Sequence, residues 1–263
     1  MGTNIKRCSS ADGVAITYTA FGSGPPLLLA MSWATTIDGQ LSNAGAAPFY
    51  ERLAAARRVV MFDRRGVGAS GRDPADLSMP AQLADIRAVA GALGIERCDV
   101  LGDNDGCYVA VAWATAYPKR VARLALWSPL VTGRDARPAQ MRAFAQLMRD
   151  DWTAACQQWA RYRATEAEER QRIAETFGAM TSPRVAASYL EWEADEDLTE
   201  LLPRVIAPAL VVNTRRGGPR SLGVASLLAD GRFVTVDPPK GADDLDLAEL
   251  ARIIIEFLDR EPG

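Results

Sequence analysis

The 263-residue sequence contains no histidine. Histidine is the usual general base of enzymes, the side chain that titrates nearest neutral pH and the commonest metal ligand. Its absence excludes imidazole chemistry by this chain, and we expect no metal site. Any mechanism has to use carboxylates, amides, hydroxyls, thiols, arginine or the backbone.

Other features are also missing. The sequence has no apolar run of about 18 residues that could span a bilayer, and its arginines form no basic stripe. With a formal charge of −3, we expect a small-molecule partner, no nucleic acid, no membrane and no cofactor. The cysteines lack CxxC spacing and residues 1–13 lack the apolar core of a signal peptide, so we expect reduced thiols in a cytoplasmic protein. The oligomeric state is left open.

Short apolar runs alternate with segments of helical period, which is typical of a mainly parallel sheet flanked by helices. This pattern predicts an α/β fold. The predicted strands are residues 15–20, 26–31, 58–62, 98–102, 121–127, 208–213 and 232–236. The predicted helices are residues 80–93, 105–117, 221–229 and 246–260.

Between the strands at 121–127 and 208–213, the sequence shows helical periodicity alone, over about 138–202. We interpret residues 134–205 as an inserted helical lid, and residues 1–133 with 206–263 as the core. Trp152 and Trp159 fall on one helical face of the lid. That face either packs on the core or lines a pocket, and packing is the commoner role of such a stripe.

The segment Gly102-Asp103-Asn104-Asp105-Gly106 joins an apolar strand to an apolar helix. A tight strand-to-helix corner needs glycine on both sides, because side chains there would collide with neighbouring backbone. The central residue of such a corner often has a positive φ, which asparagine tolerates better than most residues. The pattern therefore predicts a nucleophile elbow with Asn104 at its apex, where no nucleophile is present.

With the segments 12–18, 62–70, 117–118 and 120–121, the elbow makes the chain resemble the α/β-hydrolase superfamily. Within that superfamily it is most similar to the hydrolase-like domains found beside bacterial nucleotide cyclases. The resemblance implies an α/β-hydrolase fold over nearly the whole length. It also implies that Met31-Ser32-Trp33 lies where relatives place an oxyanion-hole loop, with the amides of Trp33 and Asp105 as donors.

The same resemblance places the three triad positions of the superfamily. They fall on Asn104 in place of serine, Gly218 in place of the acid and Asp244 in place of histidine. No hydroxyl and no base to activate it remain, so we do not expect serine-hydrolase chemistry.

Two kinds of side chain, a carboxylate and a thiol, could substitute for the missing nucleophile. Asp103 or Asp105 could act only after a one-residue shift that would displace a glycine from the turn, so we do not favour either. Cys107 lies near a helix N-terminus but has no imidazole partner, and we interpret it as a packing residue.

If the fold is right, four carboxylates converge on the pocket floor: Asp103, Asp105, Asp243 and Asp244. Like charges in a half-buried cleft raise one another's pKa, which would suit acid and base catalysis. The alternative is structural: Asp103 and Asp105 point outward or pair with Arg64 or Arg65, while Asp243 and Asp244 cap the last helix.

Three functions remain open. The favoured one is a non-hydrolytic biosynthetic enzyme (cyclase, isomerase, dehydratase or lyase) acting on an apolar small molecule in a lidded pocket. The second is a pseudo-hydrolase that binds a small molecule or a protein, and the third is a hydrolase with an unconventional nucleophile. The candidate catalytic residues are Asn104, Asp103, Asp105 and Asp244. The candidate substrate-binding residues are Ser32, Trp33, Trp127, Trp152 and Trp159.

Overall fold

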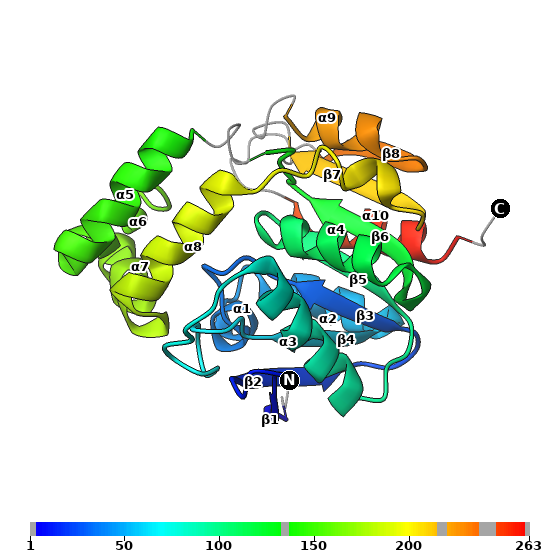
Figure 1. Cartoon of the computed structure of the whole chain (residues 1–263), viewed down its shortest axis with the longest axis horizontal. Helices are drawn as coiled ribbons and strands as arrows, with labels where there is room; N and C mark the ends of the chain where they lie inside the picture. The colour runs from blue at the N-terminus through cyan, green and yellow to red at the C-terminus, as the bar shows by residue number, and fades with distance from the viewer. Residues whose placement is uncertain (1–3, 133–136, 215–219, 237–245, 261–263) are drawn as a thin grey trace.

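The computed structural model describes residues 4–132, 137–214, 220–236 and 246–260. Within them, eight strands form one sheet in the order β1-β2-β4-β3-β5-β6-β7-β8 (Figure 1). Strands β1 and β2 are antiparallel to their neighbours, and the pairs from β3–β4 to β7–β8 are parallel. The strands are β1 (Lys6–Ser9), β2 (Ala15–Phe21), β3 (Pro26–Ala30), β4 (Arg58–Phe62), β5 (Cys98–Asp103), β6 (Val121–Trp127), β7 (Ala209–Thr214) and β8 (Gly231–Val236).

Helices cover both faces of the sheet. Buried side chains of α3, α4 and α9 pack on one face, and those of α2 and α10 pack on the other. The core helices are α1 (Ile37–Ser42), α2 (Ala47–Ala56), α3 (Met79–Ala92), α4 (Gly106–Ala116), α9 (Arg220–Leu227) and α10 (Leu247–Leu258). The predicted α/β-hydrolase fold is thereby confirmed.

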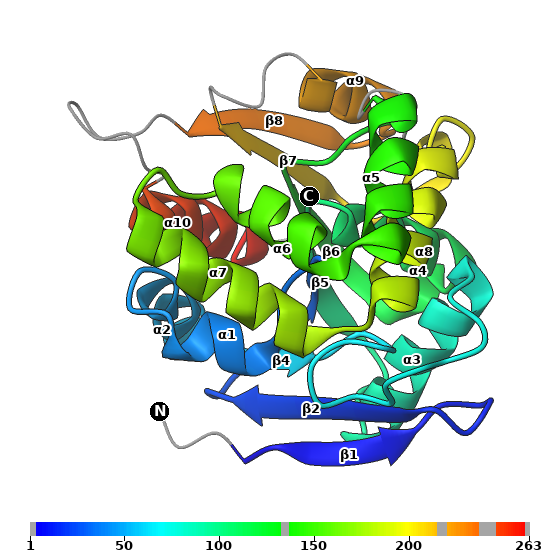
Figure 2. The same cartoon turned by 90° about the vertical axis from the view of Figure 1, so that its left-hand side faces the viewer.

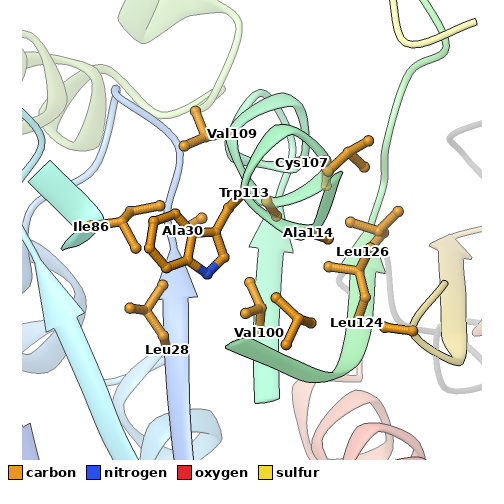
Figure 3. Close-up of a cluster of buried hydrophobic side chains, with 14 of the residues drawn as sticks. Leu28, Ala30, Ile86, Val100, Cys107, Val109, Trp113, Ala114, Leu124 and Leu126 are labelled. Atoms are coloured by element: carbon orange, nitrogen blue, oxygen red, sulfur yellow. The ribbon is translucent and has the colours of Figure 1, made fainter. Parts of the chain in front are cut away.

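Trp113 of α4 shows how the first face is filled. Its indole lies between Leu28 of β3, Val100 of β5 and Ile86 of α3 (Figure 3). It is 1% exposed, and α4 as a whole is apolar on almost all sides because it is buried between the sheet and its neighbours. This packing fixes α4, and with it the turn between β5 and α4.

The segment between β6 and β7 is helical, as predicted. Its four helices are α5 (Pro138–Asp150), α6 (Trp152–Arg161), α7 (Ala167–Met180) and α8 (Pro183–Asp195). They form a group on one side of the sheet, and Figure 2 shows them across the front of the molecule. Their own apolar cluster includes Trp33 and Val67 of the core, so the inserted helices and the core share a buried contact.

No helix in the described ranges has the length and apolarity needed to cross a bilayer. The sequence pattern missed three elements there: β1, α1 and α2. Strand β1 has four residues and is mostly exposed at the sheet edge, so it shows no apolar signal. Helix α1 has six residues, and α2 begins without a side-chain cap hydrogen bond.

Candidate functional site

The turn between β5 and α4 has the predicted elbow geometry. Asn104 has a φ of 49°, in the left-handed region, and its side chain is exposed at the apex. Its backbone N–H donates to the Trp127 carbonyl at 3.0 Å, and its own carbonyl accepts from the Cys107 N–H at 3.0 Å. The turn is therefore fixed on both sides, and the apex carries an amide.

The two flanking glycines are required by close backbone approach, as predicted. A Cβ on Gly106 would lie 2.0 Å from the Ala30 carbonyl oxygen, and one on Gly102 would lie 2.8 Å from the Cys107 Cα. Any other residue would push α4 away from the sheet.

Asp105 points away from the apex and into the protein. It is 5% exposed, and its Oδ2 forms a buried ion pair with Arg64. The same oxygen accepts the Trp33 backbone N–H at 3.4 Å. The amide that we expected in an oxyanion hole therefore already has a carboxylate partner from the protein itself. Its pairing with Arg64 is the structural alternative that we left open, although the charge of Asp105 still acts on Asp103.

Arg64 links the elbow to the inserted helices. Its guanidinium donates to the Gln82 side chain and lies 4.8 Å from the Tyr189 ring centroid and 5.2 Å from that of Trp192, both on α8. A cation over an aromatic face is attracted by the ring quadrupole, more strongly when both are out of water. Next to it, Arg65 is fully buried and pairs with Asp85 and Asp12. Both arginines therefore pair with carboxylates, and Arg64 does so with Asp105.

Asp103 lies on the other side of the elbow. In a strand, alternate side chains share a face, so Asp103 follows Leu101 toward α2 rather than toward Arg64. It lines a small cavity with seven other residues: Leu29, Ala30, Met31, Phe49, Tyr50, Leu101 and Trp127.

The side chain of Asp103 is an unusually weak acid for an aspartate. Its Oδ1 accepts a hydrogen bond from the Asn104 amide at 2.6 Å. Burial, and next the charge of Asp105, raise the pKa of Asp103 to about 7, although attraction to Arg163 and the Asn104 hydrogen bond oppose the rise. A carboxyl with this pKa exchanges its proton near neutral pH.

The candidate aromatic residues separate into two groups. Trp33 stacks on Tyr189 with centroids 5.5 Å apart and lies 6.0 Å from Trp159. Trp152 lies 5.4 Å from Phe177. The contacts of Trp33 join the core to the inserted helices, whereas the contact of Trp152 with Phe177 joins α6 to α7 within the insertion.

Trp127 belongs to the second group. It lies 5.9 Å from Phe49 and lines the cavity at Asp103. Ser32 is half-buried, and its hydroxyl accepts the Ala34 N–H at 3.3 Å. Trp127, a candidate substrate-binding residue, thus shares this cavity with Asp103, a candidate catalytic carboxyl.

Several residues near the elbow were not anticipated. Glu193 of α8 approaches Asp105 and Arg64, and burial, followed by the charge of Asp105, raises the pKa of Glu193. Phe49 and Tyr50 come from α2, a helix that the sequence pattern missed. Their spacing with Leu53, at i+3 and i+4, was the available signal.

Some predictions concern residues outside the described ranges: Gly218, Asp243 and Asp244. In the described part of the chain, the side chain that caps α10 is Asp246, which accepts the Ala248 and Glu249 N–H groups at 3.0 Å. The described residues also include no cluster of carboxylates and cysteines arranged to hold a metal ion.

Cys107 is a buried thiol, as predicted. It is 1% exposed and donates to the Trp127 carbonyl at 3.5 Å. Burial, and next the charges of Asp103 and Asp105, raise the pKa of Cys107 far above its usual value. Since the thiolate is the reactive form, this thiol is unreactive.

Comparison with known proteins agrees with the fold. A family model described as the alpha/beta hydrolase fold matches residues 25–177, so the chain belongs to the α/β-hydrolase family. It is 29% identical over 222 residues to N-formylmaleamate deformylase of Pseudomonas putida, covering 80% of this chain and 78% of that protein. It is 33% identical over 153 residues to a 2-hydroxymuconate semialdehyde hydrolase of Pseudomonas putida, covering 53% of each.

Solved structures give the same result for the fold. The enol-lactonase from Burkholderia xenovorans LB400 superposes with a TM-score of 0.79 at 20% identity, covering 97% of this chain and 100% of that one. An esterase from Exiguobacterium antarcticum has a TM-score of 0.81 at 16% identity, covering 97% and 99%. At this identity the likeness shows the fold alone.

Proposed function

We propose that this protein binds a small molecule at the elbow end of its sheet and does not carry out serine-hydrolase catalysis. One observation supports this most directly: beneath Asn104, the Asp105 carboxylate binds the Trp33 amide and is itself paired with Arg64. In a working acyl-transfer site, that amide would have to be free to stabilise a developing oxyanion.

The chemistry of the apex supports the same proposal. Asn104 offers no hydroxyl, and the chain has no imidazole to activate one. Loss of a catalytic triad leaves about 10³–10⁴-fold acceleration from the oxyanion hole and binding. Here the expected amide of the hole is also engaged, so even that residual activity would be reduced.

The location suits binding. In open α/β sheets, ligands bind beyond the carboxyl ends of the strands. The Asp103 cavity lies there, at the ends of β3, β5 and β6. We further propose that residues 134–205 act as a lid over this end, because α8 contributes Tyr189 and Trp192 to the Arg64 cluster.

A second candidate is hydrolysis by a carboxylate-activated water. Two observations favour it: the relatives reported above are named as a deformylase and a semialdehyde hydrolase, and Asp103 has a pKa of about 7, suitable for a general base. The non-hydrolytic reactions that we considered first, by a cyclase, isomerase, dehydratase or lyase, have no counterpart among these relatives' names, and we do not retain them.

A fluorophosphonate probe and a panel of small esters, formamides and carbamates test the proposal. We expect no covalent labelling and no turnover above the buffer rate. Covalent labelling at any residue would overturn the proposed function. Turnover without labelling that rises through about pH 7 and is lost in Asp103→Asn would instead establish the second candidate.

A further inference from the structure

The cavity at Asp103 combines one carboxyl with several aromatic rings. Its walls come from β3, β5, the end of β6 and the first turn of α2. Phe49 lies 5.1 Å from Tyr50 and 5.9 Å from Trp127, measured between ring centroids. The Tyr50 hydroxyl donates a hydrogen bond to Gln40 Oε1 at 3.0 Å. Because the hydroxyl already has this partner, Tyr50 contributes its aromatic ring to the cavity wall.

Within the described part of the chain, no cationic group donates a hydrogen bond to the carboxyl in this cavity. Asp105, Asp85 and Asp99 each form an ion pair with a buried arginine. The donor that binds Asp103 is instead the neutral amide of Asn104. Arg163 attracts the Asp103 carboxylate from the turn after α6, but its guanidinium is stacked 3.9 Å from the Trp159 ring centroid and, among the described residues, forms no ion pair with Asp103.

The surroundings favour a cation. The faces of aromatic rings carry negative charge, and a cation near them gains about 0.5–2 kcal/mol depending on its hydration. Burial and the charge of Asp105 disfavour the ionised form of Asp103, and a cation beside the carboxylate would stabilise that form. The cavity has room for about one water-sized group, which fits a primary ammonium and excludes a quaternary one.

We propose that this cavity binds the ammonium group of a primary amine, with Asp103 as the counter-ion and the Phe49, Tyr50 and Trp127 rings as its walls. This inference rests on the proposed function, because it names the chemical class of the ligand for the same site.

Calorimetric titration with butylammonium chloride tests it, with butan-1-ol and sodium butyrate as neutral and anionic analogues of the same length. At about pH 8, where Asp103 is mostly ionised, we expect butylammonium to bind at least about 10-fold more tightly than either analogue. Asp103→Asn should abolish this preference. Asp230→Asn, which changes an exposed carboxylate before β8, should keep it.

Equal affinity for the three compounds, no detectable binding of butylammonium, or an unchanged preference in Asp103→Asn would each overturn the inference. The wild-type protein provides a second measurement that does not depend on how the variant folds. Near pH 6, binding of the ammonium should release a proton from Asp103, seen as a dependence of the binding heat on the buffer's ionisation enthalpy. Among the residues that the structure describes, the titratable or charged groups that interact with Asp103 are Tyr50, Asp105, Cys107 and Arg163. Absence of proton release would also overturn the inference.

The outcomes separate the two proposals. Fluorophosphonate labelling together with a preserved amine preference overturns the proposed function alone. Resistance to labelling together with no amine preference overturns the amine inference alone.

Discussion

Asn104 shows how one residue can keep a fold feature and lose its chemistry. The corner demands a positive φ, and asparagine adopts it at a lower cost than most residues. The amide side chain also donates to Asp103. Asn104 therefore has two structural roles: it adopts the backbone conformation of the elbow, and it donates a hydrogen bond to the neighbouring carboxyl.

Restoring a hydroxyl at the apex should not restore hydrolysis. In Asn104→Ser, the Trp33 amide is still bound by Asp105, and the chain still has no histidine. We expect ester hydrolysis to change by less than about 10-fold and fluorophosphonate labelling to remain absent, measured by intact-protein mass spectrometry. Stoichiometric labelling of the new serine would contradict this and show that another group acts as its base.

Asp103 should impose a pH dependence on stability. Its pKa is raised from 3.8 to about 7 in the folded protein, so the native state holds a proton that the unfolded state releases between these values. Its contribution to stability is therefore present below about pH 4 and is lost as the pH rises to about 7.

Asp103→Asn removes this titration. Relative to wild type, the variant should gain about 1–3 kcal/mol of unfolding free energy between about pH 4.5 and pH 8, a figure reduced for the partial exposure of the carboxyl. Denaturant unfolding at the two pH values measures the difference, and Asp230→Asn serves as the exposed control. A difference that does not vary with pH would contradict a raised pKa for Asp103.

At the scale of elements, Arg64 joins three parts of the fold. It leaves the loop after β4, pairs with Asp105 at the start of α4, and lies under the aromatic side chains of α8. Tyr189 strengthens the same connection, since its hydroxyl donates to the Arg65 carbonyl at 2.9 Å. The position of α8 over the elbow thus depends on a buried ion pair and not only on apolar packing.

Arg64→Met should be strongly destabilising, because it leaves Asp105 buried without its cation. Removing one partner of a buried ion pair costs about 3–5 kcal/mol. The matched control is Arg142→Met, which breaks the exposed pair with Asp195 between α5 and α8 and should cost less than about 1 kcal/mol. Unfolding in guanidinium chloride measures the free energy lost in each variant. Equal small losses would show that buried Asp105 does not need the charge of Arg64.

The elements themselves were largely predictable from their periodicity. The strand expected at 98–102 is Cys98–Asp103, and the helix expected at 80–93 is Met79–Ala92. Apolar alternation and run length are local properties, so they are visible in the sequence. Helix α2 was missed, and with it the origin of Phe49 and Tyr50, because its N-cap residue is Ala46, a residue type that does not mark a helix start.

At the scale of the whole molecule, the thiols report on the integrity of the fold. The sequence has four cysteines, all unpaired in the structure. Burial raises the pKa of Cys98 to about 12 and that of Cys156 to about 11, and raises that of Cys107 as well. Only Cys8, at the edge strand β1, is partly exposed.

A thiol-specific disulfide reagent should therefore modify one residue in the native protein and all four after unfolding. The native reaction should disappear in Cys8→Ser, and the rate for the other three should follow global unfolding. Fast native labelling of Cys107 would contradict the packing of α4 against the sheet.

The sequence by itself determined the α/β pattern, the helical insertion, the elbow with Asn104 at its apex and the lack of an imidazole. These features follow from hydrophobic periodicity and glycine spacing, which are local in the sequence, and from amino-acid composition. Only the tertiary structure decided that Asp103 and Asp105, two positions apart, face opposite sides of the elbow. Asp105 meets Arg64 from 41 positions away, and Asp103 meets the rings of α2, because the left-handed turn at Asn104 redirects the chain between them. The partner of a buried charge depends on which distant segments pack there, and no local pattern records that.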